Sequence, residues 1–338
     1  MPADRRTFLK SAAGMVSATA TTFVSSPARA QGAVKPRSTA FEMPRGMTLL
    51  NMRTAVGPRL GVKRPNGVLD VAAAAARYKL PAPFDTDDLL QNGKGAMLKT
   101  LVDAAADGPA GLYLQESAVR HAPLITRPEK IIMMGFNYRR HAAETGTPIP
   151  ANPTLFNKFN NTLNHHGGTI VLPTAAAKQF DYEVELVIVF GRECRNVSEA
   201  DALSYVAGYC TGNDFSARDL QYLTSQFMIG KTFDGFAPLG PHLVTSDLVG
   251  DPNALRLECR VNGEQRQDWN TNDMIFNCRQ LISFASRMMT IKPGDILFTG
   301  TPHGVVFGKP KGEQVWLKPG DRVACSVEKL GELSFTLA

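Results

Sequence analysis

The segment that most constrains the fold of this chain is residues 180–190, where closely spaced acids lead into a run of apolar residues. A run rich in valine, leucine, isoleucine and phenylalanine predicts a strand inside a buried sheet. Alternate residues of a strand share a face, so Glu183 and Glu185 are expected to point the same way. Two buried carboxylates this close are unfavourable unless a cation lies between them. The segment therefore predicts a buried sheet that carries a cation site.

A third acid stands at a predicted junction between a strand and a helix. It is Asp214, in the sequence Gly212-Asn213-Asp214-Phe215-Ser216-Ala217-Arg218. Carboxylate oxygens are the ligands that a hard cation such as Mg²⁺ prefers. We therefore expect Glu183, Glu185 and Asp214 to hold one divalent ion.

Residues 1–30 differ from the rest of the chain and are predicted to be an export signal. Arg5-Arg6 precedes a weakly apolar run, residues 11–24, and Ala28-Arg29-Ala30 has the small-x-small pattern of a cleavage site. This pattern is typical of a twin-arginine signal cleaved after Ala30, and it predicts a periplasmic protein. No other segment is apolar enough to suggest a membrane partner after cleavage.

Charge and cysteine content argue against two other classes of protein. The net charge is +6, but residues 1–30 hold four of the 37 basic and one of the 31 acidic residues, so the rest carries only +3. A nucleic-acid-binding protein would be expected to show a clustered basic stripe, so this charge gives no support for nucleic-acid binding. The five cysteines are too widely spaced for a Cys-x-x-Cys site. We interpret them mainly as small core residues, with a periplasmic disulfide as the less favoured alternative.

The remaining chain is predicted to divide into a linker, residues 31–45, a small α+β domain, residues 46–124, and a larger β-rich domain, residues 125–338. In the small domain we expect strands at 47–53 and 60–63 and helices at 71–78 and 94–105. In the larger domain we expect strands at 130–134 and 295–298, an amphipathic helix at 278–289, and a hairpin that turns at Asn262-Gly263. Lys-Pro-Gly-Asp, at 292–295 and 318–321, predicts two turns.

A histidine and a glutamate form the clearest candidate for acid–base chemistry. His141 and Glu144 are three residues apart in a predicted helix, so the carboxylate can hold the imidazole in one tautomer and raise its basicity. Such a pair suits a general base, and a surface ion pair is the alternative. Four other histidines lack supporting neighbours in the sequence and are interpreted as surface or core residues, namely His121, His165, His166 and His242.

Two loops contain residues that could contact a ligand. Gly230-Lys231-Thr232 resembles the end of a phosphate-binding loop, but Ser225 stands where that loop requires glycine, which argues against nucleotide binding. Lys231 lies in an apolar loop and is expected to need an anionic partner, with Asp219 or Asp234 as the candidates. Gly300-Thr301-Pro302 is a small-residue loop where backbone could approach a ligand closely, or a plain turn.

Five motifs, in the same order, resemble those of the fumarylacetoacetate hydrolase family. They are Asn137-Tyr138 with His141, Asp181-Tyr182-Glu183-Val184-Glu185, residues 213–221, Gly230-Lys231 with residues 234–241, and Gly300-Thr301-Pro302. The resemblance covers about residues 125–338. It implies a mixed β-sandwich roll, a homodimer, and one Mg²⁺ or Mn²⁺ ion on Glu183, Glu185 and Asp214. It also implies that His141 and Glu144 activate water, that Lys231 stabilises an enolate, and that substrate is bound by Tyr138, Arg218, Gln221 and Thr301.

The chain departs from the family pattern at Phe159, Phe215, Phe227-Met228 and residues 304–308, which add aromatic bulk near the expected cleft. The leading interpretation is a hydrolase that cleaves a carbon–carbon bond in a 2,4-dioxo acid or a β-diketone. Decarboxylation of an oxaloacetate-like acid, or keto–enol isomerisation, needs the same metal without an attacking water and is the close alternative. A periplasmic protein that binds dicarboxylates without turnover is the alternative of a different class.

Overall fold

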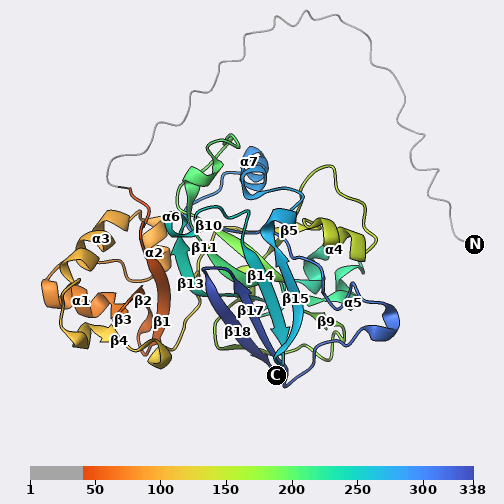
Figure 1. Cartoon of the computed structure of the whole chain (residues 1–338), viewed down its shortest axis with the longest axis horizontal. Coiled ribbons are helices and arrows are strands. Elements are labelled where there is room, and N and C mark those ends of the chain that lie inside the picture. Colours follow the sequence, from red (N-terminus) through yellow and green to blue (C-terminus); the bar gives the residue numbers. More distant parts are fainter. Residues whose placement is uncertain (1–40) are drawn as a thin grey trace, which may run out of the picture. The chain divides into compact units, whose positions relative to one another are not determined.

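The computed structural model describes residues 41–338 and shows a mixed α+β fold dominated by β-sheet (Figure 1). The predicted export signal and residues 31–40 of the predicted linker lie outside the described residues. The described part contains a large mixed sheet of eleven strands, a second sheet of five strands and a two-stranded pair. This architecture agrees with the sheet-rich fold that the family resemblance implied.

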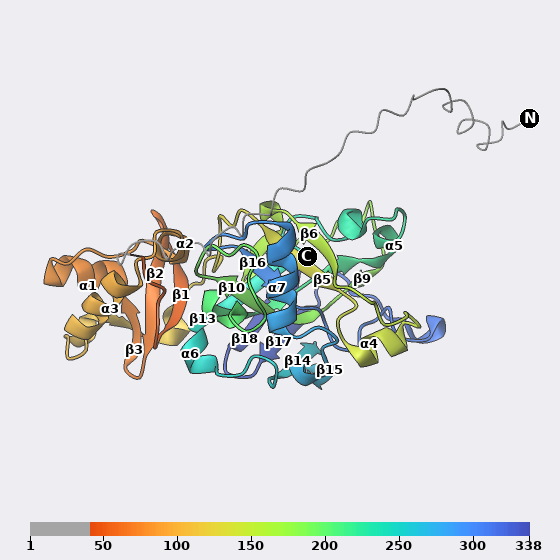
Figure 2. The same ribbon diagram turned by 90° about the horizontal axis from the view of Figure 1, so that it is seen from above.

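The large sheet runs from the N-terminal strands into the centre of the molecule. Its order is β4 (Tyr113–Leu114), β3 (Gly67–Asp70), β2 (Gly57–Arg64), β1 (Thr48–Thr54), β13 (Ala237–Thr245), β11 (Val206–Asn213), β10 (Val184–Phe190), β16 (Ile296–Phe298), β5 (Ile131–Gly135) and β6 (Thr154–Lys158), with β7 (Leu163–His165) beside β13. β1 and β13 pair antiparallel and lie side by side in both views (Figure 2). The division near residue 124 stays a prediction, and these two strands hydrogen-bond across it.

The second sheet packs against the large sheet to form the main core. It consists of β15 (Glu264–Asn270), β14 (Arg256–Val261), β17 (Arg322–Val327), β18 (Gly331–Leu337) and β8 (Gly168–Ile170). Leu186 and Ile188 of β10 share one hydrophobic cluster with Leu257 and Leu333 of the second sheet. Thr211 of β11 donates a side-chain hydrogen bond to the backbone oxygen of Gly331, 3.1 Å away, and so ties the two sheets together.

β10 is buried along its whole length because both of its faces are covered. Leu186 and Ile188 face the core shared with the second sheet and with helix α7 (Cys278–Met288). Val187 and Val189 belong to the cluster that contains the N-terminal helices α1 (Val71–Tyr78) and α3 (Gly95–Ala104). The apolar run therefore forms a doubly covered strand, as its composition predicted.

The prediction of one unbroken strand at residues 180–190 is wrong. β9 (Phe180–Asp181) pairs with β12 (Ser216–Ala217), whereas β10 begins only at Val184. The break follows from Asp181, whose carboxylate accepts hydrogen bonds from the backbone amides of Tyr182, Val306 and Phe307. These bonds to a distant loop compete with continuation of the ladder. Glu183 consequently lies just before β10, opposite Asp214, whose amide donates to the Glu183 backbone oxygen at 2.9 Å.

Most other predicted elements are confirmed within one to three residues. The β14–β15 hairpin turns at Asn262 and Gly263, which both have positive φ, and Gly294 and Gly320 occupy left-handed positions in the two Lys-Pro-Gly-Asp turns. All five cysteines are buried and free, as small core residues should be. The remaining elements are α2 (Thr86–Gln91), α4 (Arg139–Glu144), α5 (Arg218–Gln221), α6 (Ser246–Val249), and the 3₁₀ segments η1 (Ala110–Leu112), η2 (Glu116–Ala118), η3 (Asn160–Thr162), η4 (Ala202–Tyr205), η5 (Phe227–Gly230), η6 (Thr271–Asp273) and η7 (Lys311–Glu313).

Within residues 41–338, none of the helices combines the length and the apolar character needed to cross a membrane.

Candidate active site

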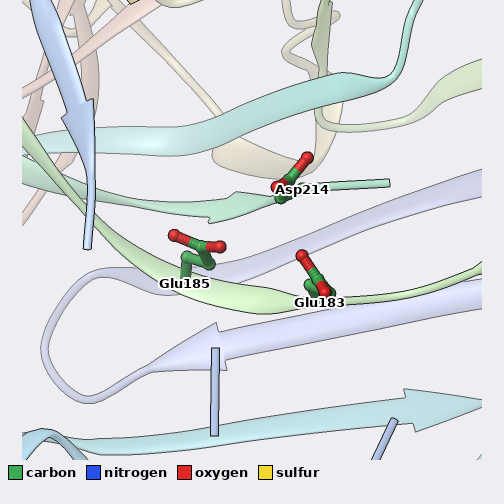
Figure 3. A group of neighbouring side chains, drawn as sticks. All are labelled: Glu183, Glu185 and Asp214. Atoms are coloured by element: carbon green, nitrogen blue, oxygen red, sulfur yellow. The ribbon is translucent and has the colours of Figure 1, made fainter. Parts of the chain in front are cut away.

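The three predicted metal ligands lie together on two neighbouring strands. Glu183 directly precedes β10, Glu185 is the second residue of β10, and Asp214 directly follows β11 (Figure 3). The antiparallel register pairs Val184 with Asn213, which brings Asp214 opposite Glu183. One carboxylate oxygen from each residue lies within 4.8 Å of the others, and all three residues are buried. The fold thus assembles the expected acidic triad, while its role as a metal site stays a prediction.

Three basic side chains surround two of these acids. Lys231 places its Nζ 2.8 Å from Glu183 Oε2 and 2.8 Å from Asp214 Oδ2. The two candidate partners suggested for Lys231 from the sequence, Asp219 and Asp234, are therefore wrong. Lys231 follows η5, which ends at Gly230, and its side chain lines the pocket beside the triad. It therefore reaches Glu183 and Asp214 instead of the acids nearer to it in the sequence.

Arg218 and Lys158 complete this basic shell. Arg218 Nη2 lies 2.7 Å from Glu183 Oε1, and Lys158 Nζ lies 2.6 Å from Asp214 Oδ1. Lys158 also donates to the backbone oxygens of Phe215 and Phe236, so it fixes the segment that carries Asp214. Sequence reasoning missed Lys158 because its partners lie more than 50 residues away in the chain.

Glu185 differs from the other two acids because none of the described basic residues lies within ion-pair distance of it. Its Oε2 accepts a hydrogen bond from the backbone amide of Gly300 at 2.6 Å. Burial, together with the charges of Asp214 and Glu183, raises the pKa of Glu185 well above its usual value. A bound cation would stabilise the ionised form of this buried acid, which has no positive partner among the described residues.

The balance of charge also fits a divalent ion. Four buried carboxylates, Asp181 and the triad, face only three basic side chains, Lys158, Arg218 and Lys231. With all four acids ionised, the set carries one excess negative charge, and a divalent ion would leave one excess positive charge. All three proposed ligands are oxygen donors, which suits Mg²⁺ and Mn²⁺ better than a softer metal. The residues present fit such an ion.

The lysines differ in how firmly they hold their protons. Burial opposes the charge of Lys231, but Asp214 and Glu183 outweigh it and raise the pKa of Lys231. Burial dominates at Lys158 and lowers its pKa to about 8, although Asp214 lies beside it. Glu183 shows the opposite case of an acid. Burial would raise the pKa of Glu183, but the positive charges of Arg218 and Lys231 hold this pKa below its usual value.

A pocket of about 400 Å³ opens beside the triad. Its polar wall includes Arg218, Gln221 and Lys231, and its apolar wall is aromatic, formed by Phe136, Phe156, Tyr222, Phe227 and Phe307. Phe227 and Phe307 come from segments singled out as departures from the family pattern. The other two departures do not shape the pocket, because Phe215 is buried against Phe236 and Phe159 is half exposed outside it.

The predicted histidine–glutamate pair forms on α4 and faces this pocket. His141 Nδ1 lies 2.8 Å from Glu144 Oε1, and His141 is among the residues that line the pocket. Glu144 also accepts a hydrogen bond from the amide of Gly304 at 3.0 Å. An Nδ1–H that donates to Glu144 leaves Nε2 as the basic atom of the ring. Phe136, which has a positive φ of 54° that is unusual for an aromatic residue, stacks near the imidazole with 6.3 Å between ring centroids.

Asp181 organises the edge of the pocket without lining it. It is fully buried and accepts hydrogen bonds from the amides of Val306 and Phe307, both at 2.9 Å. The same carboxylate accepts from Arg218 Nε at 2.9 Å. It therefore joins the loop at residues 304–308 to Arg218, whose Nη1 in turn donates to Gln221 Oε1. Its position at the head of the acidic motif was the only sequence signal for this role.

Two of the predicted substrate contacts are placed differently from the rest. Thr301 lines the pocket, but its hydroxyl donates to the backbone oxygen of Val184 and accepts from Gln267 Nε2, both at 2.9 Å. Tyr138 precedes α4 and is fully buried in the core, outside the set of side chains that line the pocket. The substrate-binding roles of both residues stay predictions.

Comparison with known proteins gave consistent matches. A family model described as fumarylacetoacetate (FAA) hydrolase C-terminal matches residues 130–338. A human protein named oxaloacetate tautomerase FAHD2A, mitochondrial, is 39% identical over 298 residues, which cover 86% of this chain and 91% of that protein. The structure of fumarylacetoacetate hydrolase from Exiguobacterium antarcticum has a TM-score of 0.70 and 29% identity, covering 86% of this chain and 99% of that one. Maleylpyruvate hydrolase from Sphingobium sp. SYK-6, in complex with manganese(II) and pyruvate, has a TM-score of 0.70, 28% identity and the same coverage.

Proposed function

Because the chain belongs to the fumarylacetoacetate hydrolase family, we propose that it is a metal-dependent enzyme that interconverts the keto and enol forms of a short 2-oxo dicarboxylic acid such as oxaloacetate. Named relatives in this comparison include hydrolases, isomerases and tautomerases. The observation that carries the proposal is a single small pocket that joins a buried acidic triad to a carboxylate-held histidine. The human relative named oxaloacetate tautomerase supports the choice of substrate.

The size and charge of the pocket favour a small acid. The side chains around the pocket leave little free space, about 20 Å³ for the centres of water molecules, which favours a small substrate over a bulky one. With a divalent ion on the triad, the buried charges would sum to one positive charge, which attracts an anion. Arg218 and Lys231 line the pocket and would interact with the carboxylates and the keto oxygen of the substrate.

Glu183, Glu185 and Asp214 would hold the ion. When bound, Mg²⁺ or Mn²⁺ supplies Lewis acidity, which polarises a keto oxygen and makes the neighbouring C–H bond more acidic. Lys231 retains its charge and lies at the same wall of the pocket, so it would stabilise negative charge that develops on that oxygen.

His141 is the residue placed to move the proton. Its Nδ1–H is held by Glu144, so Nε2 would take the proton from the carbon next to the keto group. The C–H electron pair then forms the carbon–carbon double bond, and the former carbonyl oxygen takes up a proton to give the enol. The reverse sequence regenerates the keto form, so no other reactant is required.

Hydrolysis of a carbon–carbon bond in a 2,4-dioxo acid is the second candidate. The His141–Glu144 pair favours it, because the same base could take a proton from a water that attacks the distal carbonyl. The fold similarity to a maleylpyruvate hydrolase also supports this candidate. The two reactions share the enolate and differ in whether water enters the pocket.

A paired assay of the purified protein with Mn²⁺ separates the candidates. The first arm follows the decay of enol-oxaloacetate by its ultraviolet absorbance, and the second follows pyruvate release from acylpyruvates. We expect accelerated decay of the enol and no pyruvate release. Pyruvate release without accelerated enol decay would instead support the hydrolase. Tight binding of the acids without either reaction would support the dicarboxylate-binding protein.

The base is tested by His141→Ala. We expect kcat for tautomerisation to fall about 10²- to 10⁴-fold, because the proton acceptor is lost, and added imidazole to restore part of the rate. Asp103→Asn is the control, since Asp103 is exposed on α3 and forms a surface ion pair with Lys99. Full activity of His141→Ala would refute the assignment of the base.

A further inference from the structure

A second pocket lies among residues that the proposed reaction does not use. We call it the histidine pocket, because four of the six histidines of the chain line it, namely His121, His165, His166 and His242. It is larger than the candidate active site, about 1290 Å³ by the same measure, and shares no lining residue with it. Its walls come from β1, β2, η2, the turn after β7, β13 and the start of β18.

These four histidines lack supporting neighbours in the sequence, but the fold brings them together. The ring centroids of His121 and His166 are 4.9 Å apart, and those of His121 and His242 are 6.4 Å apart. His166 Nδ1 accepts a hydrogen bond from the amide of Ser334 at 3.1 Å. His165 Nδ1 donates to the backbone oxygen of His166. The sequence concealed this cluster because its members lie on segments up to 121 residues apart.

Three basic side chains, Arg53, Lys63 and Arg120, and two carboxylates, Glu116 and Glu332, line the histidine pocket, so it has an excess of one positive charge before the histidines are counted. Lys63 pairs with Glu116 at 2.7 Å, but neither Arg53 nor Arg120 forms an ion pair with a carboxylate of residues 41–338. Arg53 instead contacts the Nε2 atom of His165. Both arginines are exposed and lie at one rim, where the bridge between Met52 and His121 joins their segments. Two arginines without acidic partners beside a cavity are a site for an anion.

His242 provides an independent indication of a ligand. Its side chain is about nine-tenths buried, yet its Nε2 has no hydrogen-bond partner among the described residues. Glu116 Oε1 lies 3.3 Å away, but outside hydrogen-bonding angles. The ring has room because Gly331, with a φ of 89°, would otherwise place a Cβ 3.0 Å from His242 Nδ1. A buried polar atom without a partner is costly, and a bound acceptor would satisfy it.

We propose that the histidine pocket binds an anion with at least two negative charges, of the phosphate or polycarboxylate class. Arg53 and Arg120 would contribute charge-assisted hydrogen bonds, and His242 would donate from Nε2. A metal cation fits less well, because Arg53, Lys63 and Arg120 would repel it. Among the described residues, only the acidic triad gathers three metal-ligating atoms within 4.8 Å.

Isothermal titration with two probes tests this proposal and distinguishes the two ligand classes. The metal-loaded protein is titrated with inorganic phosphate and, separately, with tricarballylate. We expect the wild type to bind at least one of them, with the affinity reduced at least tenfold in Arg53→Met/Arg120→Met and in His242→Phe. Because both arginines are exposed, the double variant is expected to fold, and Arg120→Met alone provides a milder variant.

Two controls locate the binding. Arg77→Met removes an arginine from α1, away from both pockets, and Arg218→Met alters the candidate active site. Affinity within twofold of the wild type in both controls supports the proposal. It is overturned if neither probe binds the wild type, if the double variant and His242→Phe bind as tightly as the wild type, or if binding is lost only in Arg218→Met.

Discussion

Asp181 is expected to stabilise the candidate site, although it does not line the pocket. Its buried carboxylate bonds to Arg218 and to two amides of the 304–308 loop. In Asp181→Asn the neutral amide would leave Arg218 without this charge and turn a donor toward other donors. Removing one partner of a buried ion pair costs about 3–5 kcal/mol, so we expect a loss of this size in the free energy of unfolding.

Urea unfolding of the variant, followed by circular dichroism, measures this loss. Asp103→Asn is a matched change on the surface and should shift the free energy of unfolding by less than about 0.5 kcal/mol. An equal stability for the two variants would mean that the Asp181 bonds contribute nothing to the fold.

The residues of the site divide into those that the sequence could indicate and those that it could not. Glu183 and Glu185 are two apart, so the period of a strand placed them on one face, and the 3.6-residue period of a helix placed His141 beside Glu144. Lys158 reaches Asp214 from another strand, and no local period encodes that contact. The positive φ of Phe136 is likewise fixed by tertiary packing and not by residue type.

The 304–308 loop contacts the His141–Glu144 pair directly. A Cβ added to Gly308 would stand 2.5 Å from Glu144 Cδ, and Glu144 cannot move away without losing its bonds to His141 and Gly304. We therefore expect Gly308→Ala to displace the pair and to lower kcat for tautomerisation about 10- to 100-fold. Gly312→Ala is the matched control, because a Cβ there meets no atom within 4 Å.

Steady-state kinetics of these two glycine variants, with thermal unfolding to confirm that both fold, decides the matter. The expected pattern is a loss of kcat in Gly308→Ala alone. If the two variants turned over equally fast, the contact between loop and helix would have no part in catalysis.

Two histidines of the histidine pocket, His121 and His242, should make the free energy of unfolding depend on pH. Burial is the main cause that lowers the pKa of His121 and of His242 to about 4, from 6.5, with Lys63 and the other histidines adding repulsion and Glu116 opposing it. Between pH 6.5 and 4 the unfolded chain therefore binds more protons than the folded chain. The free energy of unfolding should fall as the pH falls through this window.

Replacing His242 by Gln removes one of these titrations. Urea unfolding at several pH values between 4 and 7 should show a shallower decline for His242→Gln than for the wild type. Identical slopes would show that His242 does not hold a depressed pKa in the folded protein.

At the level of helices and strands, the sequence predicted the bounds of an element correctly where interactions between neighbouring residues determine them. α1 was predicted to the residue, because Asp70 caps its N-terminus, alanines fill it and Lys79 ends it in a left-handed conformation. Residues 180–190 were predicted as one strand but are divided, because the amides of residues 306 and 307 bind Asp181 from 125 positions away. A sequence pattern contains no record of such a partner.

For the chain as a whole, we propose export through the twin-arginine route, with cleavage after Ala30. Full-length protein carrying Arg5→Lys/Arg6→Lys should remain in the cytoplasmic fraction, whereas the wild type should reach the periplasm in a shortened form. Mass spectrometry of the periplasmic protein locates the cleavage site. Equal export of the two proteins would contradict the proposed route.

We also propose that the mature chain is a homodimer, as the family resemblance implies. Light scattering of the purified protein should give about twice the mass of one chain at micromolar concentration. A single-chain mass over that range would contradict the assembly.

We propose that Glu183, Glu185 and Asp214 hold one divalent ion that the reaction requires. Titration with Mn²⁺, followed by the electron paramagnetic resonance of the free ion, tests it most directly. We expect one tightly bound Mn²⁺ per chain in the wild type and in the surface control Glu313→Gln, and binding at least about 100-fold weaker in Glu185→Gln, with parallel loss of tautomerase activity. Equally tight binding of Mn²⁺ by Glu185→Gln would contradict the proposed metal site.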